Sequence, residues 1–251
     1  MVNWPSALNG FPHASSSLVA DRDMQQRTET KFVVSEATAA AFVLALRDDF
    51  AVLPAGDALV ASYRSLYFDT DDLSFFHAHR CGRRVRHKVR IRHYPDRELS
   101  VLEVKTRRGE HGTAKMRCPR QYGDSTFGAD DLAFVRQHCG PTGELLPQAW
   151  IAYRRVTLLG LRSPERVTLD MQLDVWRASG HGQFRRAVVI EVKQPRLDHH
   201  SVAMQQLRAA GCRPGWMSKY CTAIALTSPD VRANQLMNRM RQLKAVGTWT
   251  H

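Results

Sequence analysis

The 251-residue sequence contains only five cysteines, and none of them follows the spacing of a metal or redox site. It has no Cys-x-x-Cys pair and no Cys/His pattern of the zinc-finger kind, and the number of cysteines is odd. This spacing argues against a structural zinc site and against a disulfide scaffold. It favours reduced thiols in an intracellular chain.

Long apolar runs are missing as well. No stretch approaches the ~18 residues of a membrane span, and the N-terminus lacks the charged start and apolar core of a signal peptide. The hydrophobic content of 43% is ordinary for a globular protein with a real core. We therefore expect no transmembrane segment and a soluble, cytoplasmic protein.

Acidic residues are scarce relative to basic ones. The chain has 36 Lys and Arg against 24 Asp and Glu, which gives a formal net charge of +12 and a pI near 10.0. Such a balance favours phosphate-rich partners, which include nucleic acid, polyphosphate, nucleotides and anionic membrane surfaces. Charge alone does not choose among them.

The basic residues are most ordered between positions 83 and 105. Within 88–92 three basic residues alternate with two apolar ones, and after a turn at 94–96 the segment 102–105 repeats the alternation with Glu103 and Lys105. Because successive side chains of a strand point to opposite faces, this pattern predicts a hairpin with one charged face. Cations on one face lie about 7 Å apart and repel unless an anion lies between them. The pattern therefore predicts a polyanionic partner.

The same alternation predicts about eight short strands, nearly all antiparallel, with helices between them that carry single apolar stripes. The strands are expected at 27–34, 59–69, 88–92, 102–105, 114–117, 150–161, 167–176 and 187–194. The first helix is expected from Ser35, as N-cap, to about position 49. Asp69, Asp71 and Asp72 favour a helix cap over a metal loop, because no Gly and no closing Glu follow at the required positions.

Two arrangements satisfy this pattern, a sandwich with its charges outside and a barrel with its charges inside. Glu29, Glu103 and Glu191 each stand two residues before a lysine, and acids within a cationic face suit divalent metals that bridge to phosphate oxygens. We therefore expect an α+β fold, a closed antiparallel eight-stranded β-barrel (tunnel) with a basic lumen and helices packed on the outside. Residues 1–26 are expected to be a mobile N-terminal arm, 27–227 the tunnel domain, and 228–251 a C-terminal basic helix.

An ordered set of motifs then resembles the VTC domain, the polyphosphate polymerase branch of the triphosphate tunnel metalloenzyme (CYTH-like) superfamily. The motifs are T-E-T-K-F at 28–32, R-S-L-Y-F-D-T at 64–70, K-V-R-I-R at 88–92, L-E-V-K at 102–105, Y-R-R at 153–155, E-R-V-T-L-D at 165–170, I-E-V-K-Q at 190–194 and S-K-Y-C at 218–221. The resemblance covers about residues 27–226. The chain also resembles the small stand-alone members of this branch, which are bacterial.

The resemblance implies transfer of the ATP γ-phosphate to a growing polyphosphate chain, with Mn²⁺ or Mg²⁺, in a basic tunnel. The implied partners are ATP and inorganic polyphosphate or triphosphate. Two alternatives stay open: a tunnel-type triphosphatase or other triphosphate-processing enzyme, and a non-catalytic polyphosphate-binding module. Tunnel hydrolases begin with E-x-E-x-K, whereas Arg27 stands at the first of these positions, which favours the VTC branch. Nucleic acid is disfavoured because the basic strands lack interleaved aromatic residues.

The family's site residues are carried over by motif. The catalytic cations implied are Arg90, Arg92, Lys105 and Lys193. Further phosphate-binding residues are Lys31, Arg64, Lys115, Arg155, Arg166 and Lys219, together with Lys88, which alternates with the two catalytic arginines of its strand. The metal-binding carboxylate falls on Glu191, with Glu29 and Glu103 as further contributors. Arg154 is an alternative to Arg155, because the tandem arginines leave open which one points inward.

Overall fold

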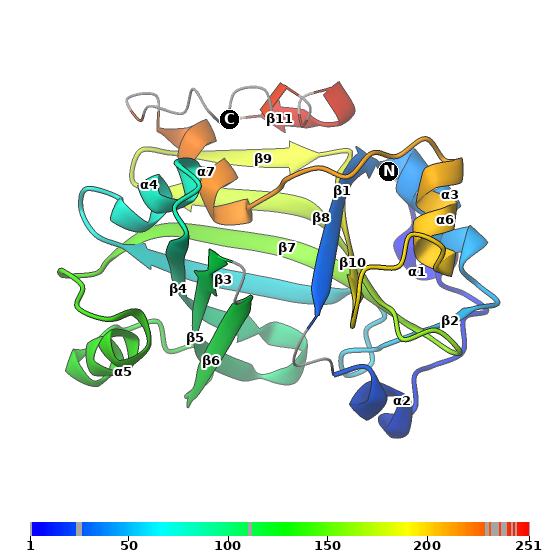
Figure 1. Ribbon diagram of the computed structural model, residues 1–251, viewed down its shortest axis with the longest axis horizontal. Helices are drawn as coiled ribbons and strands as arrows, with labels where there is room; N and C mark the ends of the chain where they lie inside the picture. Colours follow the sequence, from blue (N-terminus) through cyan, green and yellow to red (C-terminus); the bar gives the residue numbers. More distant parts are fainter. Residues whose placement is uncertain are drawn as a thin grey trace.

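The computed structural model describes residues 2–23, 27–109, 112–228, 231, 236, 240–241, 243 and 245–250, and it has an α+β architecture (Figure 1). The strands are β1 (Thr28–Ser35), β2 (Phe50–Val52), β3 (Ala61–Asp69), β4 (Val85–Tyr94), β5 (Leu99–Arg108), β6 (Thr113–Arg120), β7 (Leu146–Gly160), β8 (Arg166–Arg177), β9 (Gly180–Arg185), β10 (Ala187–Gln194) and β11 (Thr248–Thr250). The helices are α1 (Trp4–Ala7), α2 (Ser16–Asp21), α3 (Glu36–Ala45), α4 (Ser74–Arg80), α5 (Ala129–Cys139), α6 (Val202–Ala209) and α7 (Lys219–Thr227), with a 3-10 turn at Pro95–Arg97.

All strands belong to one antiparallel sheet of 11 strands, whose main path is β1-β10-β8-β7-β3-β4-β5-β6. These are the eight strands that the alternation predicts. Within the described residues, β1 and β6 end this path and do not pair with each other, so the expected closed barrel is wrong. Alternation places one face of each strand inward in an open curled sheet as much as in a barrel. Closure depends on strand tilt and stagger, which the pattern does not contain.

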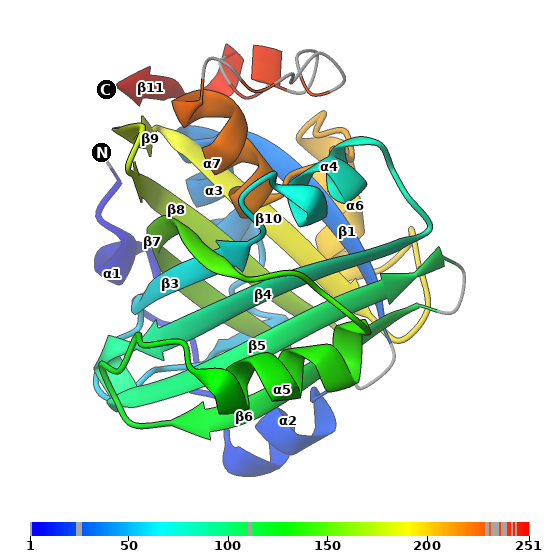
Figure 2. The same cartoon turned by 90° about the vertical axis from the view of Figure 1, so that its left-hand side faces the viewer.

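The sheet is strongly curled, and β4, β5 and β6 pass in front of β7 and β8 (Figures 1 and 2). Its inner side, called the concave face below, brings β5 close enough to β1 for Lys105 to interact electrostatically with Glu29 and Lys31. The curl therefore brings the charged side chains of the concave face together without a continuous wall of hydrogen-bonded strands, and this charged interior is called the channel below.

The outer side, called the convex face, carries the apolar residues of the alternating strands. Ile190 and Val192 of β10 pack under α1, α3 and α6, whereas Ile91 and Leu102 of β4 and β5 pack under α5. Ser35 caps α3 as expected, since its Oγ accepts a hydrogen bond from the Thr38 amide at 3.1 Å. These helices confirm the expected packing of helices on the outer face.

Two helices depart from that expectation, because α4 and α7 contribute to an apolar cluster on the concave side. Tyr220 of α7 stacks on Tyr67 of β3 with ring centroids 5.1 Å apart. Its hydroxyl donates to Asp69, which also accepts from the amides of Phe75 and Phe76 at the start of α4. The capping role expected for Asp69 is confirmed, and the same carboxylate fixes α7 against the sheet.

The two ends of the chain differ from the sequence-based expectations. A mobile arm is expected at residues 1–26, whereas Trp4, Leu8 and Phe11 are buried against the convex core. These apolar residues have no periodicity, so only the tertiary contacts give them a place. The basic helix expected at 228–251 lies largely outside the described residues, and its final part forms β11 on β9. No helix in the described ranges is long and apolar enough to cross a membrane.

Candidate functional site

Strand register gathers most of the expected site residues on the concave face. Lys88 and Arg90 of β4 stand directly opposite Lys105 and Glu103 of β5, so these four side chains share one face. Pairing extends this face in both directions along the sheet. Its charged residues are Glu29, Lys31, Lys88, Arg90, Arg92, Glu103, Lys105, Lys115, Arg117, Arg155, Arg166, Asp170, Glu191 and Lys193, and Lys219 reaches it from α7.

Glu103 lies at the centre of one cationic cluster and is 1% exposed. Its carboxylate oxygens lie 2.5 Å from Arg90, 3.7 Å from Arg92 and 3.3 Å from Arg117, and they also contact the Lys115 ammonium. Burial raises the pKa of Glu103, but the surrounding arginines and Lys115 outweigh burial and hold it well below its usual range. Glu103 is therefore an anionic counterion for these four side chains.

Asp170 of β8 has the same function in a second cluster. It accepts hydrogen bonds from Nε and Nη2 of Arg155, the second at 2.6 Å, and it contacts Lys219 of α7. Burial raises the pKa of Asp170, whereas Arg155 and Lys219 lower it to about 2. Sequence reasoning did not select Asp170, although it shares the alternating face of Arg166. This shared face was the feature of the sequence that could have identified Asp170.

A third cluster joins β1 and β10. The Lys31 ammonium lies 2.8 Å from Glu29 and also contacts Glu191, whose other oxygen lies 2.8 Å from Lys193. Burial raises the pKa of Glu29, but Lys31, Lys105 and Lys193 lower it to about 2. Glu29 and Glu191 are thus two ionised carboxylates that meet at one lysine.

The remaining channel cations have no ion-pair partner in the part of the chain that the structure describes. Lys88 and Lys105 occupy directly opposite positions on the neighbouring strands β4 and β5. Neither forms an ion pair within 4.0 Å with a carboxylate of the described residues. Burial, with repulsion from Lys105, lowers the pKa of Lys88 to about 8. Burial also lowers the pKa of Lys105. The channel therefore carries more positive charge than its own carboxylates neutralise, which suits an anionic ligand.

Tyrosines complete the concave face, and the sequence analysis did not select them. Arg92 lies over the rings of Tyr63, Tyr94 and Tyr153 at 5.3, 6.0 and 5.9 Å, and Lys219 Nζ lies 4.5 Å from the ring of Tyr153. Tyr153 is 3% exposed, and its hydroxyl has no hydrogen-bond partner among the described residues. A buried hydroxyl without a partner is costly, which favours a bound acceptor at this position. The alternation of Tyr63 and Tyr67 with Arg64 was the signal that could have found them.

Two of the expected placements are settled by register. Arg64 pairs with His93 and Ala152 on the convex face, and its guanidinium lies 4.4 Å from the ring of Trp150. The expectation that Arg64 lines the channel is therefore wrong. The motif predicts the strand correctly, but the alternation of side chains along that strand places Arg64 on the convex face. Of the tandem arginines, Arg155 reaches the channel, whereas Arg154 donates to the Val60 carbonyl at 2.9 Å.

The carboxylates fit a divalent metal unequally. Glu103 does not fit, because four cations already surround it. Glu29 and Glu191 do fit, because they converge and are ionised, and Mg²⁺ is usually held by one or two carboxylates together with phosphate oxygens and water. Within the described residues no group of three His, Cys, Asp or Glu side chains converges, so phosphate and water would have to supply the remaining ligands.

Comparison with known proteins matches the VTC domain family over residues 26–126 and 134–228. Among solved structures, a candidate adenylate cyclase from Bacillus halodurans aligns with a TM-score of 0.53 and 15% identity over 77% of this chain and 94% of that chain. An adenylyl cyclase candidate from Hippeastrum, described as having a dominant triphosphatase activity, aligns with a TM-score of 0.49 and 14% identity over 81% and 98%. No curated protein matches the sequence. At 15% identity, the alignment with the Bacillus halodurans structure shows a shared fold.

Proposed function

Because the chain belongs to the VTC domain family, we propose that it is a polyphosphate polymerase-like phosphotransferase. It transfers the γ-phosphate of ATP to a growing polyphosphate chain bound on the concave face. The observation that carries this proposal is the opposed pair Lys88 and Lys105, which forms no ion pair with a carboxylate of the described residues. Like charges in opposite positions destabilise a sheet, and a bound polyanion removes this repulsion.

Phosphoryl transfer needs little covalent chemistry from the protein, because positioning and charge neutralisation supply most of the rate. Arg90, Arg92, Lys105 and Lys193 bind the β- and γ-phosphates, and the planar guanidinium of Arg92 can donate two parallel hydrogen bonds to one phosphate. The rest of the anion is held by Lys31, Lys88, Lys115, Arg155, Arg166 and Lys219. The Tyr153 hydroxyl donates a hydrogen bond to a phosphate oxygen.

Glu29 and Glu191 would hold Mn²⁺ or Mg²⁺. When bound, such an ion neutralises charge on the phosphate oxygens. Lys31 lies between the two carboxylates, at 2.8 Å from Glu29, and an ion held by them would leave this lysine free to contact the phosphates. Glu103 and Asp170 keep the arginines of the other two clusters oriented.

The test is incubation of the purified protein with ATP and Mn²⁺, with and without a short polyphosphate primer, followed by gel electrophoresis and ³¹P NMR. We expect chains to lengthen as ATP is consumed, and Arg92→Ala, Lys105→Ala and Glu191→Ala to abolish this reaction. Arg162→Ala is the matched control, because Arg162 is 82% exposed and pairs with Asp49. Unchanged turnover in both Arg92→Ala and Lys105→Ala would contradict the proposal.

A second candidate is hydrolysis of a short triphosphate. It is favoured by α7, because Tyr220 stacks on Tyr67 and Lys219 contacts Asp170, so side chains occupy part of the concave face. Less room for a long chain suits a short substrate. The same incubation separates the two reactions, since a triphosphatase releases orthophosphate and forms no chain longer than its primer.

A further inference from the structure

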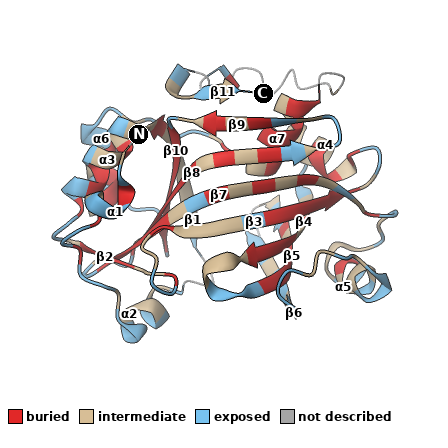
Figure 3. Ribbon diagram, turned by 180° about the vertical axis from the view of Figure 1, so that it is seen from behind, coloured by how far each residue is buried: buried red, intermediate tan, exposed pale blue. Residues whose placement is uncertain are grey.

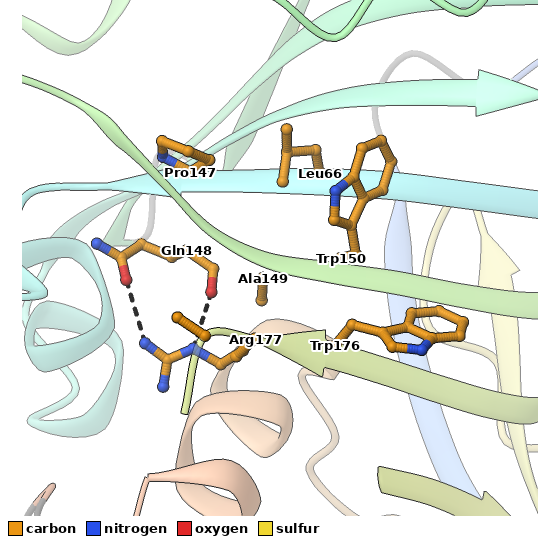
Figure 4. Close-up of a pocket in the computed structure, with 8 residues that line it drawn as sticks. Leu66, Pro147, Gln148, Ala149, Trp150, Trp176 and Arg177 are labelled. Carbon is orange, nitrogen blue, oxygen red and sulfur yellow. Dashed lines mark hydrogen bonds between the residues drawn. The ribbon is translucent and has the colours of Figure 1, made fainter. Parts of the chain in front are cut away.

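A row of aromatic side chains crosses the convex face, away from the channel. Trp150 of β7, Trp176 of β8 and His181 of β9 occupy directly opposite positions on three neighbouring strands. Trp176 is 39% exposed, and its ring stacks on His181 with centroids 5.3 Å apart. Figure 3 shows exposed positions on this side of β7 and β8, and Figure 4 shows Trp150 and Trp176 beside each other. These three residues are called the aromatic row below.

Two exposed arginines flank the aromatic row. The Arg64 guanidinium lies 4.4 Å from the ring of Trp150, and the buried His93 stacks on the same ring at 5.7 Å. Arg154 lies on β7, four residues after Trp150 and two before Val156. All three residues belong to the convex face of this strand. Neither arginine forms an ion pair with a carboxylate in the described part of the chain. The aromatic row is therefore an apolar surface with positively charged side chains beside it.

A shallow groove lies along this row. Its volume is about 170 Å³, and Leu66, Pro147, Trp150 and Trp176 form much of its lining (Figure 4). Arg177 also borders the groove, but its guanidinium is engaged by Gln148, through bonds of 2.8 Å to the carbonyl and 3.1 Å to the side-chain oxygen. The groove thus offers flat apolar surface of the size of one planar ring, with cations beside it.

The helices leave this part of the sheet uncovered. The convex cores under α3 and α5 bury their apolar side chains, whereas Trp176 is exposed on a strand of the same sheet. An apolar protein surface would leave Arg64 and Arg154 without anionic partners, and a membrane surface would offer headgroup phosphates but no planar rings to stack on the two tryptophans. A single strand of nucleic acid satisfies both features, since its bases stack on aromatic rings and its phosphates pair with arginine. Aromatic residues in adjacent positions of neighbouring strands are the arrangement with which sheet surfaces stack successive bases.

We propose that the aromatic row, with Arg64 and Arg154, binds single-stranded nucleic acid on the convex face. The bases stack on Trp176 and Trp150, and the two arginines contact the phosphates. This site is separate from the channel, which faces the opposite side of the sheet. It also gives a place to Arg64, which the strand parity excludes from the channel.

The test is fluorescence anisotropy with a labelled single-stranded hexanucleotide, in saturating tripolyphosphate so that the channel is occupied. A second oligonucleotide with two abasic positions has the same phosphates but lacks two bases. We expect the complete strand to bind more tightly, by about tenfold for each stacked base. Trp176→Ala should remove most of this difference, and Trp176→Phe should retain part of it. Arg64→Ala should weaken both strands and reduce the dependence of binding on salt.

Tyr122→Ala is the matched aromatic control, since Tyr122 is 44% exposed and lies outside the row. The proposal is overturned if complete and abasic strands bind equally, which would indicate attraction of phosphate to a basic protein only. It is also overturned if Trp176→Ala leaves the difference unchanged, or if that variant instead converts a dimer to a monomer in light scattering. Thermal unfolding of each variant checks that it is folded, because substitution of an exposed residue should change the melting temperature little.

Discussion

At the scale of the residue, the carboxylates of the concave face divide into two kinds. Glu103 and Asp170 are each enclosed by cations, whereas Glu29 and Glu191 converge on one lysine. A buried carboxylate among cations orients them and lowers their mutual repulsion. Only the converging pair can exchange its lysine for a metal ion. The two kinds should therefore respond differently to neutralising substitutions.

Glu103→Gln should lower the free energy of unfolding by about 3–5 kcal/mol, because it leaves several buried cations without their counterion. Urea unfolding without phosphate measures this loss. Added tripolyphosphate should restore part of it, since the anion replaces the missing charge. Glu144→Gln, at an exposed position, is the control. Unchanged stability combined with weaker Mn²⁺ binding would instead make Glu103 a metal ligand.

Lys88 should make phosphate binding sensitive to pH. Burial lowers the pKa of Lys88 to about 8 and, mainly through burial, that of Lys193 to about 8. Each lysine is charged below this pH and loses its proton as the pH rises through it. Affinity for tripolyphosphate should therefore fall above pH 8, by up to about tenfold per pH unit for each lysine. Isothermal titration calorimetry from pH 7 to pH 9 measures this dependence.

Lys88→Arg separates this effect from a general loss of charge. Arginine stays protonated throughout this range, so the variant should bind with a shallower pH dependence than the natural protein. An identical pH profile in both proteins would show that Lys88 does not titrate in the binding step.

At the scale of the element, short helices are retained here by packing. The four residues of α1 are too few for an isolated helix, yet Trp4 is 3% exposed within the convex core. Its indole nitrogen donates to Glu36 of α3 at 3.3 Å. The N-terminal segment is thus part of the layer that covers β1 and β10.

Trp4→Ala should lower the free energy of unfolding by about 3–5 kcal/mol, because it removes a large buried ring and leaves a cavity. Chemical denaturation measures this change. Ser16→Ala, at an exposed position of α2, should change stability by less than about 0.5 kcal/mol. If Trp4→Ala were as stable as the natural protein, the N-terminal segment would contribute little to the core, as expected of a mobile arm.

The prediction of elements succeeded where alternation was regular. The strands expected at 150–161 and 167–176 are observed as β7 and β8, each slightly longer. β9 was missed, because its Gly-His-Gly-Gln sequence has no apolar alternation and it is a strand only through pairing with β8. The search for aromatic residues along one basic strand also missed the aromatic row. Its members are far apart in sequence and adjacent only across strands.

At the scale of the whole molecule, the chain carries a net charge of +12, and the concave face contributes to it with more cations than carboxylates. An anion that binds the folded protein and not the unfolded chain raises stability by about 2.7 kcal/mol at a hundredfold excess over its dissociation constant. Tripolyphosphate should therefore raise the melting temperature. This effect should shrink as the salt concentration rises from about 0.1 M to about 1 M, over which the screening length falls from about 10 Å to about 3 Å.

Sodium sulfate at matched ionic strength is the control for this experiment. Sulfate carries less charge and cannot span the three cationic clusters, so it should stabilise the protein less than tripolyphosphate does. Equal stabilisation by both anions in differential scanning fluorimetry would indicate general screening of positive charge and no built site.

The amino-acid sequence by itself determined the antiparallel strands, their charged and apolar faces, the polycationic character of the site and the family, because a period of two residues and a set of motifs are local properties. Only the tertiary structure decided that the sheet stays open, that Arg155 and not Arg154 reaches the channel, and that Arg64 lies outside it. It also showed that Glu103 is surrounded by cations and that α7 lies over the concave face. These outcomes depend on curl, register and packing between distant segments, which no local pattern contains.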